Sequence, residues 1–248
     1  MFVMHPPPLR QSALELIAAG VNDCEVARRL GLPRTTVRDM RRAAARPASR
    51  PRCPRCWHTG TPVRFTPEDY AELLGLYLGD GHISQGARTQ RLRLSLDARY
   101  SQVVADAEAL LRRCFPANRV GRVRADAGAT VVPHVYHAHL ACLFPQAGPG
   151  KKHERSIVLE PWQRALVARA PWSLLRGLIR SDGCVFVNHT GRYDYVSYQF
   201  RNLSNDILQL FVDTCRVVGL RPRATSSCVR LNRRADVELL GRHVGGKA

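Results

Sequence analysis

The chain has 248 residues, of which 38 are Lys or Arg and 20 are Asp or Glu, so its formal net charge at pH 7 is +18. This length supports one sizeable core with a small second domain, and the charge favours a polyanionic partner such as nucleic acid. The sequence has no signal peptide and no apolar run near the roughly 18 residues of a membrane span, and its 8 cysteines are dispersed. We therefore expect reduced thiols, no membrane partner and a cytoplasmic, nucleoid-associated bacterial protein.

The basic residues are 35 Arg and only 3 Lys. The forked guanidinium matches phosphates and guanine edges in two-pronged geometry, so this bias favours contact with DNA. A GC-rich genome also enriches arginine and explains part of the bias.

Residues 1–46 are expected to form a separate all-α domain. Apolar periodicity predicts helices over residues 10–19, 23–30 and 34–42, with a break at Gly20 and a tight turn at Gly31-Leu32-Pro33. The predicted core residues are Ile17, Val26, Leu30, Leu32 and Val37. The unit resembles a helix-turn-helix, whose third helix would present to the DNA groove and phosphates Arg34, Thr35, Arg38, Arg41 and Arg42. The alternative is a helical interaction module with a solvated basic face.

Residues 47–65 are expected to be a linker, since they contain four prolines, several arginines and little periodicity. Cys53 and Cys56, followed by His58, have half the spacing of a zinc knuckle. The nearest later cysteines belong to the following domain, so we expect a reduced turn here and no zinc site.

Two segments repeat the same pattern, residues 73–81 (LLGLYLGDG) and 175–183 (LRGLIRSDG), with their aspartates 182 − 80 = 102 positions apart. Each is an apolar helical run that ends in Asp-Gly. Thr66 is the expected N-cap of the first helix, and Gly81 and Gly183 are expected to end the two helices. Small residues four positions apart form a flat stripe on each helix and are predicted to pack together: Gly75, Gly79, Gly177 and Ser181.

The duplication predicts two helices packed side by side, which brings Asp80 and Asp182 together at one end. A carboxylate is poorly placed at the negative end of a helix dipole, and two adjacent carboxylates repel each other. A bound divalent cation would relieve both effects. The alternative is that the two aspartates are solvated helix ends.

These paired segments resemble the motifs of the LAGLIDADG homing endonucleases, in the single-chain form with two motifs, over about residues 66–236. In that family the eighth motif position is the metal-binding acid, which falls here on Asp80 and Asp182. The sixth position, acidic in the family name, is Leu78 in one copy and Arg180 in the other. The resemblance implies an α+β fold, a duplicated αββαββ unit over residues 66–248 with halves of about 66–150 and 151–236. Its two antiparallel sheets would form a DNA-binding saddle.

Alternating patterns agree with strands after each motif helix. We predict a strand over residues 91–96, a helix over 100–114 and a hairpin of 120–124 with 130–139. The second half is predicted to contain strands over 184–188 and 193–201, a helix from Ser204 to about 218 and extended segments over 221–234. The arginines expected to contact DNA from these sheets are Arg91, Arg93, Arg122, Arg124, Arg192 and Arg201. The alternative is an ordinary α+β sheet with a solvated polar face.

The resemblance implies a monomeric endodeoxyribonuclease that cuts both strands of double-stranded DNA at a specific site. Two or three Mg²⁺ ions shared by Asp80 and Asp182 would assist phosphodiester hydrolysis. Members of the family often add a lysine near the metals, and Lys152, or its neighbour Lys151, is the candidate. A pair of lysines after Gly148-Pro149-Gly150 is alternatively plain loop charge.

The competing hypothesis is a transcriptional regulator that joins a non-cleaving LAGLIDADG-like domain to a helix-turn-helix. Retention of both acids favours the enzyme, whereas the N-terminal unit suits a regulator. An intein fragment is disfavoured, because the chain lacks a splice-junction nucleophile followed downstream by a His-Asn pair.

Overall fold

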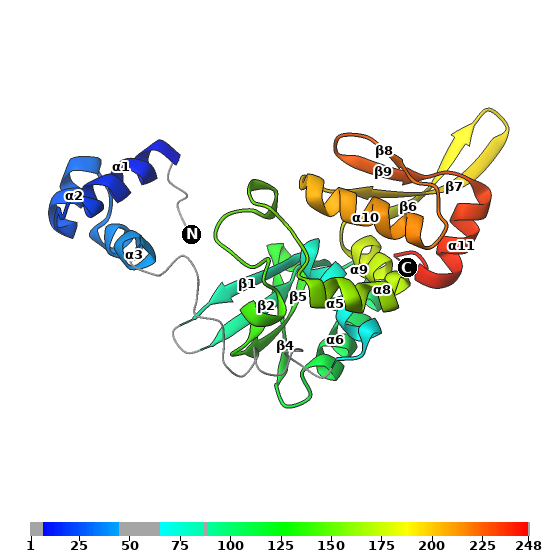
Figure 1. Ribbon diagram of the computed structural model, residues 1–248, viewed down its shortest axis with the longest axis horizontal. Helices are drawn as coiled ribbons and strands as arrows, with labels where there is room; N and C mark the ends of the chain where they lie inside the picture. Colours follow the sequence, from blue (N-terminus) through cyan, green and yellow to red (C-terminus); the bar gives the residue numbers. More distant parts are fainter. Residues whose placement is uncertain (1–6, 45–64, 87–88, 248) are drawn as a thin grey trace. The chain divides into compact units, whose positions relative to one another are not determined.

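The computed structural model describes residues 7–44, 65–86 and 89–247, which belong to two compact units, Met1–Arg52 and Cys53–Ala248 (Figure 1). No helix in these described ranges is long and apolar enough to cross a membrane. Of the linker predicted over residues 47–65, residues 47–64, including Cys53 and Cys56, lie outside the described residues.

The first unit contains three helices, α1 (Pro7–Ala18), α2 (Asp23–Leu30) and α3 (Arg34–Ala44). The Asn22 side chain accepts a hydrogen bond from the Glu25 amide at 3.0 Å and caps α2, which ends at Gly31 with φ +63°. The buried core is formed by Ala13, Ile17, Val26, Leu32 and Val37. The predicted core residue Leu30 is only partly buried and packs against this cluster.

The second unit is an α+β domain with two halves, as the sequence predicts. The first half contains α5 (Pro67–Leu78), β1 (Gly81–Gln85), β2 (Gln90–Leu94), β3 (Leu96–Asp97), α6 (Ser101–Cys114), β4 (Val120–Ala125), β5 (Thr130–His137) and α7 (Leu140–Leu143). The second half contains α8 (Pro161–Arg169), α9 (Pro171–Asp182), β6 (Gly183–Thr190), β7 (Tyr193–Arg201), α10 (Asn205–Val217), β8 (Arg223–Ala224), β9 (Cys228–Leu231) and α11 (Arg234–Val244). Strand β1 and helices α8 and α11 have no counterpart among the elements expected by range.

Each half contributes one antiparallel sheet beside the central helices α5 and α9 (Figure 1). In the first sheet the order is β1-β2-β5-β3, and β4 pairs with the other edge of β5. In the second sheet the order is β6-β7-β9-β8. Both sheets start immediately after a motif helix, with Gly81 opposite Leu94 in one and Gly183 opposite Phe200 in the other. The sheets are therefore attached to the motif helices at equivalent points.

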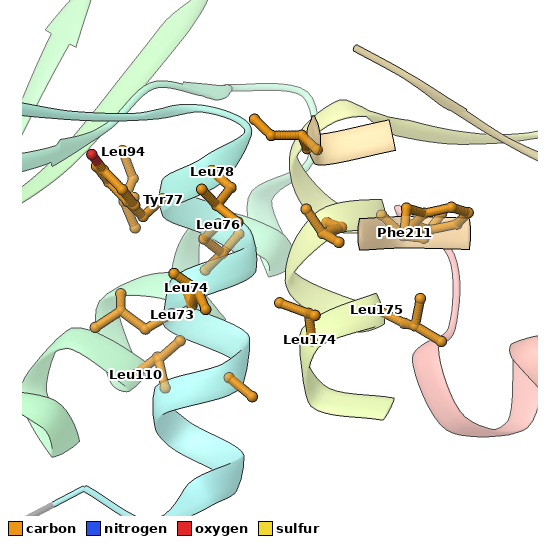
Figure 2. Close-up of a cluster of buried hydrophobic side chains, with 14 of the residues drawn as sticks. Leu73, Leu74, Leu76, Tyr77, Leu78, Leu94, Leu110, Leu174, Leu175 and Phe211 are labelled. Carbon is orange, nitrogen blue, oxygen red and sulfur yellow. The ribbon is translucent and has the colours of Figure 1, made fainter. Parts of the chain in front are cut away.

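Helices α5 and α9 pack with their backbones in contact. A Cβ atom on Gly177 would lie 2.2 Å from the Glu72 carbonyl oxygen, and one on Gly75 would lie 2.7 Å from the Leu174 carbonyl oxygen. One on Gly79 would lie 2.1 Å from the Ser181 Oγ atom. The stripe of small residues thus leaves no room for side chains, and buried leucines line both sides of it (Figure 2).

The first motif helix ends two residues earlier than expected, at Leu78, with Gly79 as its C-cap. Gly183 is the C-cap of α9, as expected, whereas Gly81 does not cap α5, and neither glycine is in the left-handed conformation. A Cβ atom on Gly81 would lie 2.4 Å from the Tyr77 Cα, and one on Gly183 would lie 2.6 Å from the Ile179 Cα. Glycine is required at both places because the outgoing strand passes against the last helical turn.

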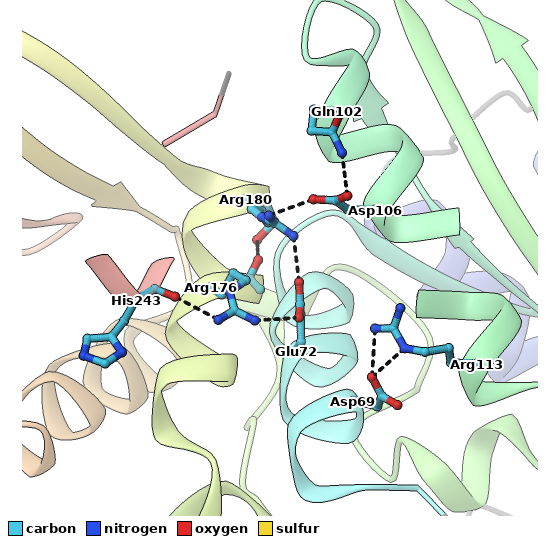
Figure 3. Close-up of polar contacts among 10 residues, drawn as sticks. Asp69, Glu72, Gln102, Asp106, Arg113, Arg176, Arg180 and His243 are labelled. Carbon is cyan, nitrogen blue, oxygen red and sulfur yellow. Dashed lines mark hydrogen bonds and ion pairs between the residues drawn. The ribbon is translucent and has the colours of Figure 1, made fainter. Parts of the chain in front are cut away.

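A polar network links the two halves (Figure 3). The buried carboxylate of Glu72 accepts hydrogen bonds from Arg176 at 3.2 Å and from Arg180 at 2.9 Å. Arg180 also forms an ion pair with Asp106 of α6 at 2.8 Å. The arginine at the sixth motif position therefore ties α9 to both α5 and α6.

Candidate active site and nucleic-acid interface

Asp80 and Asp182 lie at the same end of the packed helix pair. Asp80 directly precedes β1, and Asp182 is the last residue of α9. A Cβ atom on Gly79 would lie 3.1 Å from the Asp182 Oδ2 atom, so the chain just before Asp80 adjoins the second carboxylate. The close packing of α5 and α9 is what brings the two motif acids together.

Burial raises the pKa of both acids. Burial, with the nearby Asp182 charge, raises the pKa of Asp80 to about 7, although Lys247 and Lys152 act in the opposite direction. Burial also raises the pKa of Asp182. The Asn202 amide donates a hydrogen bond to Asp182 Oδ2 at 2.7 Å, which acts in the opposite direction and lowers this pKa. Burial lowers the pKa of Lys152 to about 8, opposed by the two carboxylates. The charges at the motif tips therefore interact strongly.

Two cavities open beside the motif tips and have related linings. The larger, about 1030 Å³, is lined by Asp80 of the first motif, Ser181 of the second and Lys247, among others. The smaller, about 440 Å³, is lined by Asp182, Gly79 and Lys152, among others. Each cavity thus combines the acid of one motif with the seventh-position residue of the other motif and with lysine, Lys247 in the larger cavity and both Lys151 and Lys152 in the smaller. The sequence duplication produces two sites with related linings.

The donor set at these cavities fits a hard divalent cation. Carboxylate and backbone carbonyl oxygens are the ligands that Mg²⁺ and Ca²⁺ prefer. Within the described residues no group of three His, Cys, Asp or Glu side chains could hold a metal by itself. A cation beside Asp80 or Asp182 would therefore need carbonyl, water or phosphate oxygens to complete its coordination.

Lys152 reaches the tip of the first motif helix. Its Nζ atom donates hydrogen bonds to the carbonyl oxygens of Tyr77 at 2.6 Å and Gly79 at 2.8 Å, and lies 5.1 Å from the centre of the Tyr77 ring. The neighbouring Lys151 side chain is exposed. The contacts therefore distinguish the two candidate lysines and favour Lys152.

Sequence reasoning missed Lys247. Its Nζ atom donates a hydrogen bond to the Ser181 carbonyl oxygen and lies 5.7 Å from the centre of the Tyr100 ring. Two signals could have identified it: lysine occurs only three times in the chain, and Lys247, like Lys152, follows a glycine-rich segment. The intervals from the motif acids are also similar, 152 − 80 = 72 and 247 − 182 = 65.

Asp80 should make the metal-free protein less stable as the pH rises. Its pKa is about 7 in the folded chain against 3.8 for the free side chain, so the folded state binds this proton more tightly. That contribution is complete below about pH 3.8 and is lost as the pH rises through 7. We expect Asp80→Asn, in EDTA, to increase the free energy of unfolding at pH 8 by about 2 kcal/mol and to leave it unchanged near pH 4. Urea denaturation at the two pH values measures this, and a less stable variant at pH 8 would contradict it.

Arg91 and Arg93 lie on the exposed face of the first sheet, as expected. Arg93 is in register with His82 and His134, and the Arg91 guanidinium lies 5.4 Å from the centre of the Tyr136 ring. In the part of the chain that the structure describes, the buried Nε atom of Arg91 has no hydrogen-bond partner. The two guanidinium groups give this face a positive charge, which suits an anionic ligand.

Arg122 and Arg124 lie on the opposite face of the same sheet. They are in register with Pro133 and Val131, whereas the exposed face of β5 carries His134 and Tyr136. The Arg122 guanidinium pairs with the Glu108 carboxylate on α6. The four arginines predicted to contact DNA from this sheet are therefore divided between its two faces.

The two predicted arginines of the second sheet lie at opposite ends of the β6–β7 hairpin. Arg201 lines the smaller cavity beside Asp182, and Arg192 lies in the exposed turn between β6 and β7. Arg230 pairs with Gln199, two residues from Arg201, and therefore shares its face. Arg230 is an addition to the expected set.

The third helix of the first unit exposes Arg34, Thr35 and Arg38. Arg41 differs from the expectation, because its guanidinium donates to the Asp23 carboxylate at 2.6 Å and to the Val21 carbonyl oxygen. It fastens α3 to the start of α2. The side chain of Arg42 lies outside the described residues.

No family model matches the sequence, and no curated protein matches it. Solved structures do match the fold. I-DmoI in complex with DNA and Mn is 13% identical, with a TM-score of 0.52 over 73% of this chain and 98% of that chain. I-DmoI in complex with DNA and Ca is 14% identical, with a TM-score of 0.50 over 72% and 90%. The N-terminal LAGLIDADG domain of DUF199/WhiA is 14% identical, with a TM-score of 0.48 over 74% and 84%.

Proposed function

We propose that this chain, which has the LAGLIDADG fold, is a metal-dependent endonuclease that cuts both strands of DNA and carries a helix-turn-helix as a second DNA-binding unit. One observation carries the proposal: two cavities each join a half-buried motif acid to lysine and to the seventh-position residue of the other motif. Because each cavity has one motif acid, each of the two DNA strands would have its own cleavage site.

The residues of this site have distinct tasks in the proposed reaction. Asp80 and Asp182 would hold two or three Mg²⁺ ions, which supply Lewis acidity and lower the pKa of an attacking water. Lys152 would counter the negative charge that develops on the scissile phosphates. Arg91, Arg93 and Arg201 would bind backbone phosphates on either side of the cut. With both motifs in one chain, a monomer is sufficient.

The second candidate is a transcriptional regulator that binds DNA through these surfaces without cutting it. The observation that favours it is the first unit, whose third helix exposes Arg34, Thr35 and Arg38 in the manner of a recognition helix. Retention of both motif acids favours the nuclease over this alternative.

Cleavage of genomic DNA separates the two candidates. The full chain is incubated with genomic fragments in Mg²⁺ or EDTA, and new double-strand ends are sequenced. Reproducible, Mg²⁺-dependent ends support the nuclease. Salt-sensitive binding to the same fragments, with no new ends in Mg²⁺, would contradict it and support the regulator.

The two faces of the first sheet should differ in their contribution to DNA affinity. We expect Arg91→Ala to weaken DNA binding about tenfold at fixed salt and to lower the salt dependence by about one released counterion. Arg124→Ala is the matched control, because it removes the same side chain from the opposite face. Fluorescence anisotropy over a series of salt concentrations measures both. Equal losses for the two variants would show that this surface does not bind DNA.

A further inference from the structure

The backbone carbonyls beside the motif acids are already engaged by ammonium groups. Lys152 donates to the carbonyl oxygen of Gly79, and Lys247 donates to that of Ser181. Gly79 and Ser181 both occupy the seventh motif position, directly before Asp80 and Asp182. The two lysines thus make equivalent contacts at the two cavities.

These lysines also occupy equivalent places in the repeat. Each follows a glycine-rich segment containing a glycine with positive φ, +76° at Gly150 and +73° at Gly245. Each ammonium lies over a tyrosine ring, that of Tyr77 or Tyr100. Each half therefore ends in a segment, carrying Lys152 or Lys247, that returns to the motif helix of that half. The repeat thus extends beyond residue 236.

We propose that Lys152 and Lys247 are built-in counter-cations of the motif acids, and that a divalent cation must displace them to bind. The proposal rests on the metal site of the proposed function. Two carboxylates and two ammonium groups balance at the motif tips, so the site is neutral without metal. Each ammonium occupies the carbonyl oxygen that a cation beside the carboxylate would use.

The physical reason is competition for the same oxygens. An ammonium and a divalent cation repel each other strongly at the separation of neighbouring ligands in a partly buried site. Metal binding therefore requires the lysine to leave the carbonyl, and its flexible stem allows the ammonium to move to a phosphate. Metal affinity should be low without DNA and higher once phosphates accept the displaced ammonium groups.

Calorimetric titration with CaCl₂, without DNA and at a fixed pH of about 7.5, tests this. Methionine keeps the length of lysine and removes its charge, so Lys152→Met and Lys247→Met are expected to bind Ca²⁺ about tenfold more tightly than the unmodified chain. Lys151→Met is the matched control: Lys151 also lines the smaller cavity, but its side chain is exposed and the contacts to the Tyr77 and Gly79 carbonyl oxygens are made by Lys152, so the affinity of this variant should stay within about twofold. The double variant Asp80→Asn, Lys247→Met should not show the increase in Ca²⁺ affinity that is expected for Lys247→Met alone. Circular dichroism confirms that each variant is folded.

The outcomes separate this inference from the proposed function. Ca²⁺ binding that is equal in the unmodified chain and both lysine variants overturns the displacement and leaves the metal site intact. Ca²⁺ binding only in the lysine variants supports the displacement, and the cleavage assay then decides the proposed function separately. No Ca²⁺ binding in any variant overturns the displacement, and the cleavage assay then decides the proposed function separately.

Discussion

Changing Asp80 or Asp182 to Asn is expected to reduce double-strand cleavage by about 1000-fold or more. A metal ion lowers the barrier to phosphodiester hydrolysis by several kcal/mol, and each 1.36 kcal/mol corresponds to about tenfold in rate. Asparagine keeps the shape of the side chain but removes the charge that holds the cation. DNA affinity should remain within about threefold, because the phosphate-binding arginines are unchanged.

Cleavage of a plasmid carrying an identified target, with anisotropy measured in parallel, checks both halves of this prediction. Asp213→Asn is the control, since Asp213 is an exposed carboxylate on α10 far along the chain from either motif. Its cleavage rate should equal that of the unmodified chain. Cleavage retained by Asp80→Asn and Asp182→Asn would remove these residues from the reaction.

Replacing Gly177 with Ala is expected to destabilise the second unit by about 3 kcal/mol or more. The added Cβ would lie 2.2 Å from the Glu72 carbonyl oxygen and 2.9 Å from the Gly75 Cα, both backbone atoms. Neither atom can move without separating α5 from α9. Because the two motif acids depend on this contact, metal binding should weaken together with stability.

Gly241→Ala provides the comparison within the same unit. Gly241 is also helical, but its added Cβ would meet only the Tyr198 hydroxyl at 3.5 Å, an ordinary contact. We expect no loss and a gain of up to about 1 kcal/mol, since alanine favours helix more than glycine does. Urea denaturation curves measure the two changes. Similar midpoints for the two variants would show that the close approach of α5 and α9 is unimportant for stability.

Local signals in the sequence were sufficient for most helices. Helix α2 begins at Asp23 and ends at Leu30, as the apolar periodicity and the turn at Gly31 predict, and Thr66 caps α5 through the Asp69 amide at 3.1 Å. The short strand β1 and helix α11 were not expected by range. Both have mixed polar sequences, and their structure depends on packing against elements distant in the chain.

The faces of the strands show where sequence reasoning stops. Arg91 and Arg93 alternate with buried leucines that indicate their face, whereas Arg122 and Arg124 alternate with Gly121 and Val123, which indicate neither. A shift of one residue in register reverses every side chain of a strand, so only the pairing of β4 with β5 could place them. The ion pair of Arg41 with Asp23 depends in the same way on how α3 crosses α2.

By itself, the sequence determined the duplicated motif, its small-residue stripe and the acids at its two ends, because these are repeated over short spacings. It thereby determined the LAGLIDADG fold. Only the tertiary structure decided that each cavity joins the acid of one motif to the seventh residue of the other, and that Lys152 and Lys247 serve the two cavities. The hydrogen bonds of these lysines join segments distant in the chain, 152 − 79 = 73 positions for Lys152 and Gly79 and 247 − 181 = 66 for Lys247 and Ser181. No short-range pattern encodes them, because their energy comes from packing and charge that exist only in the folded chain.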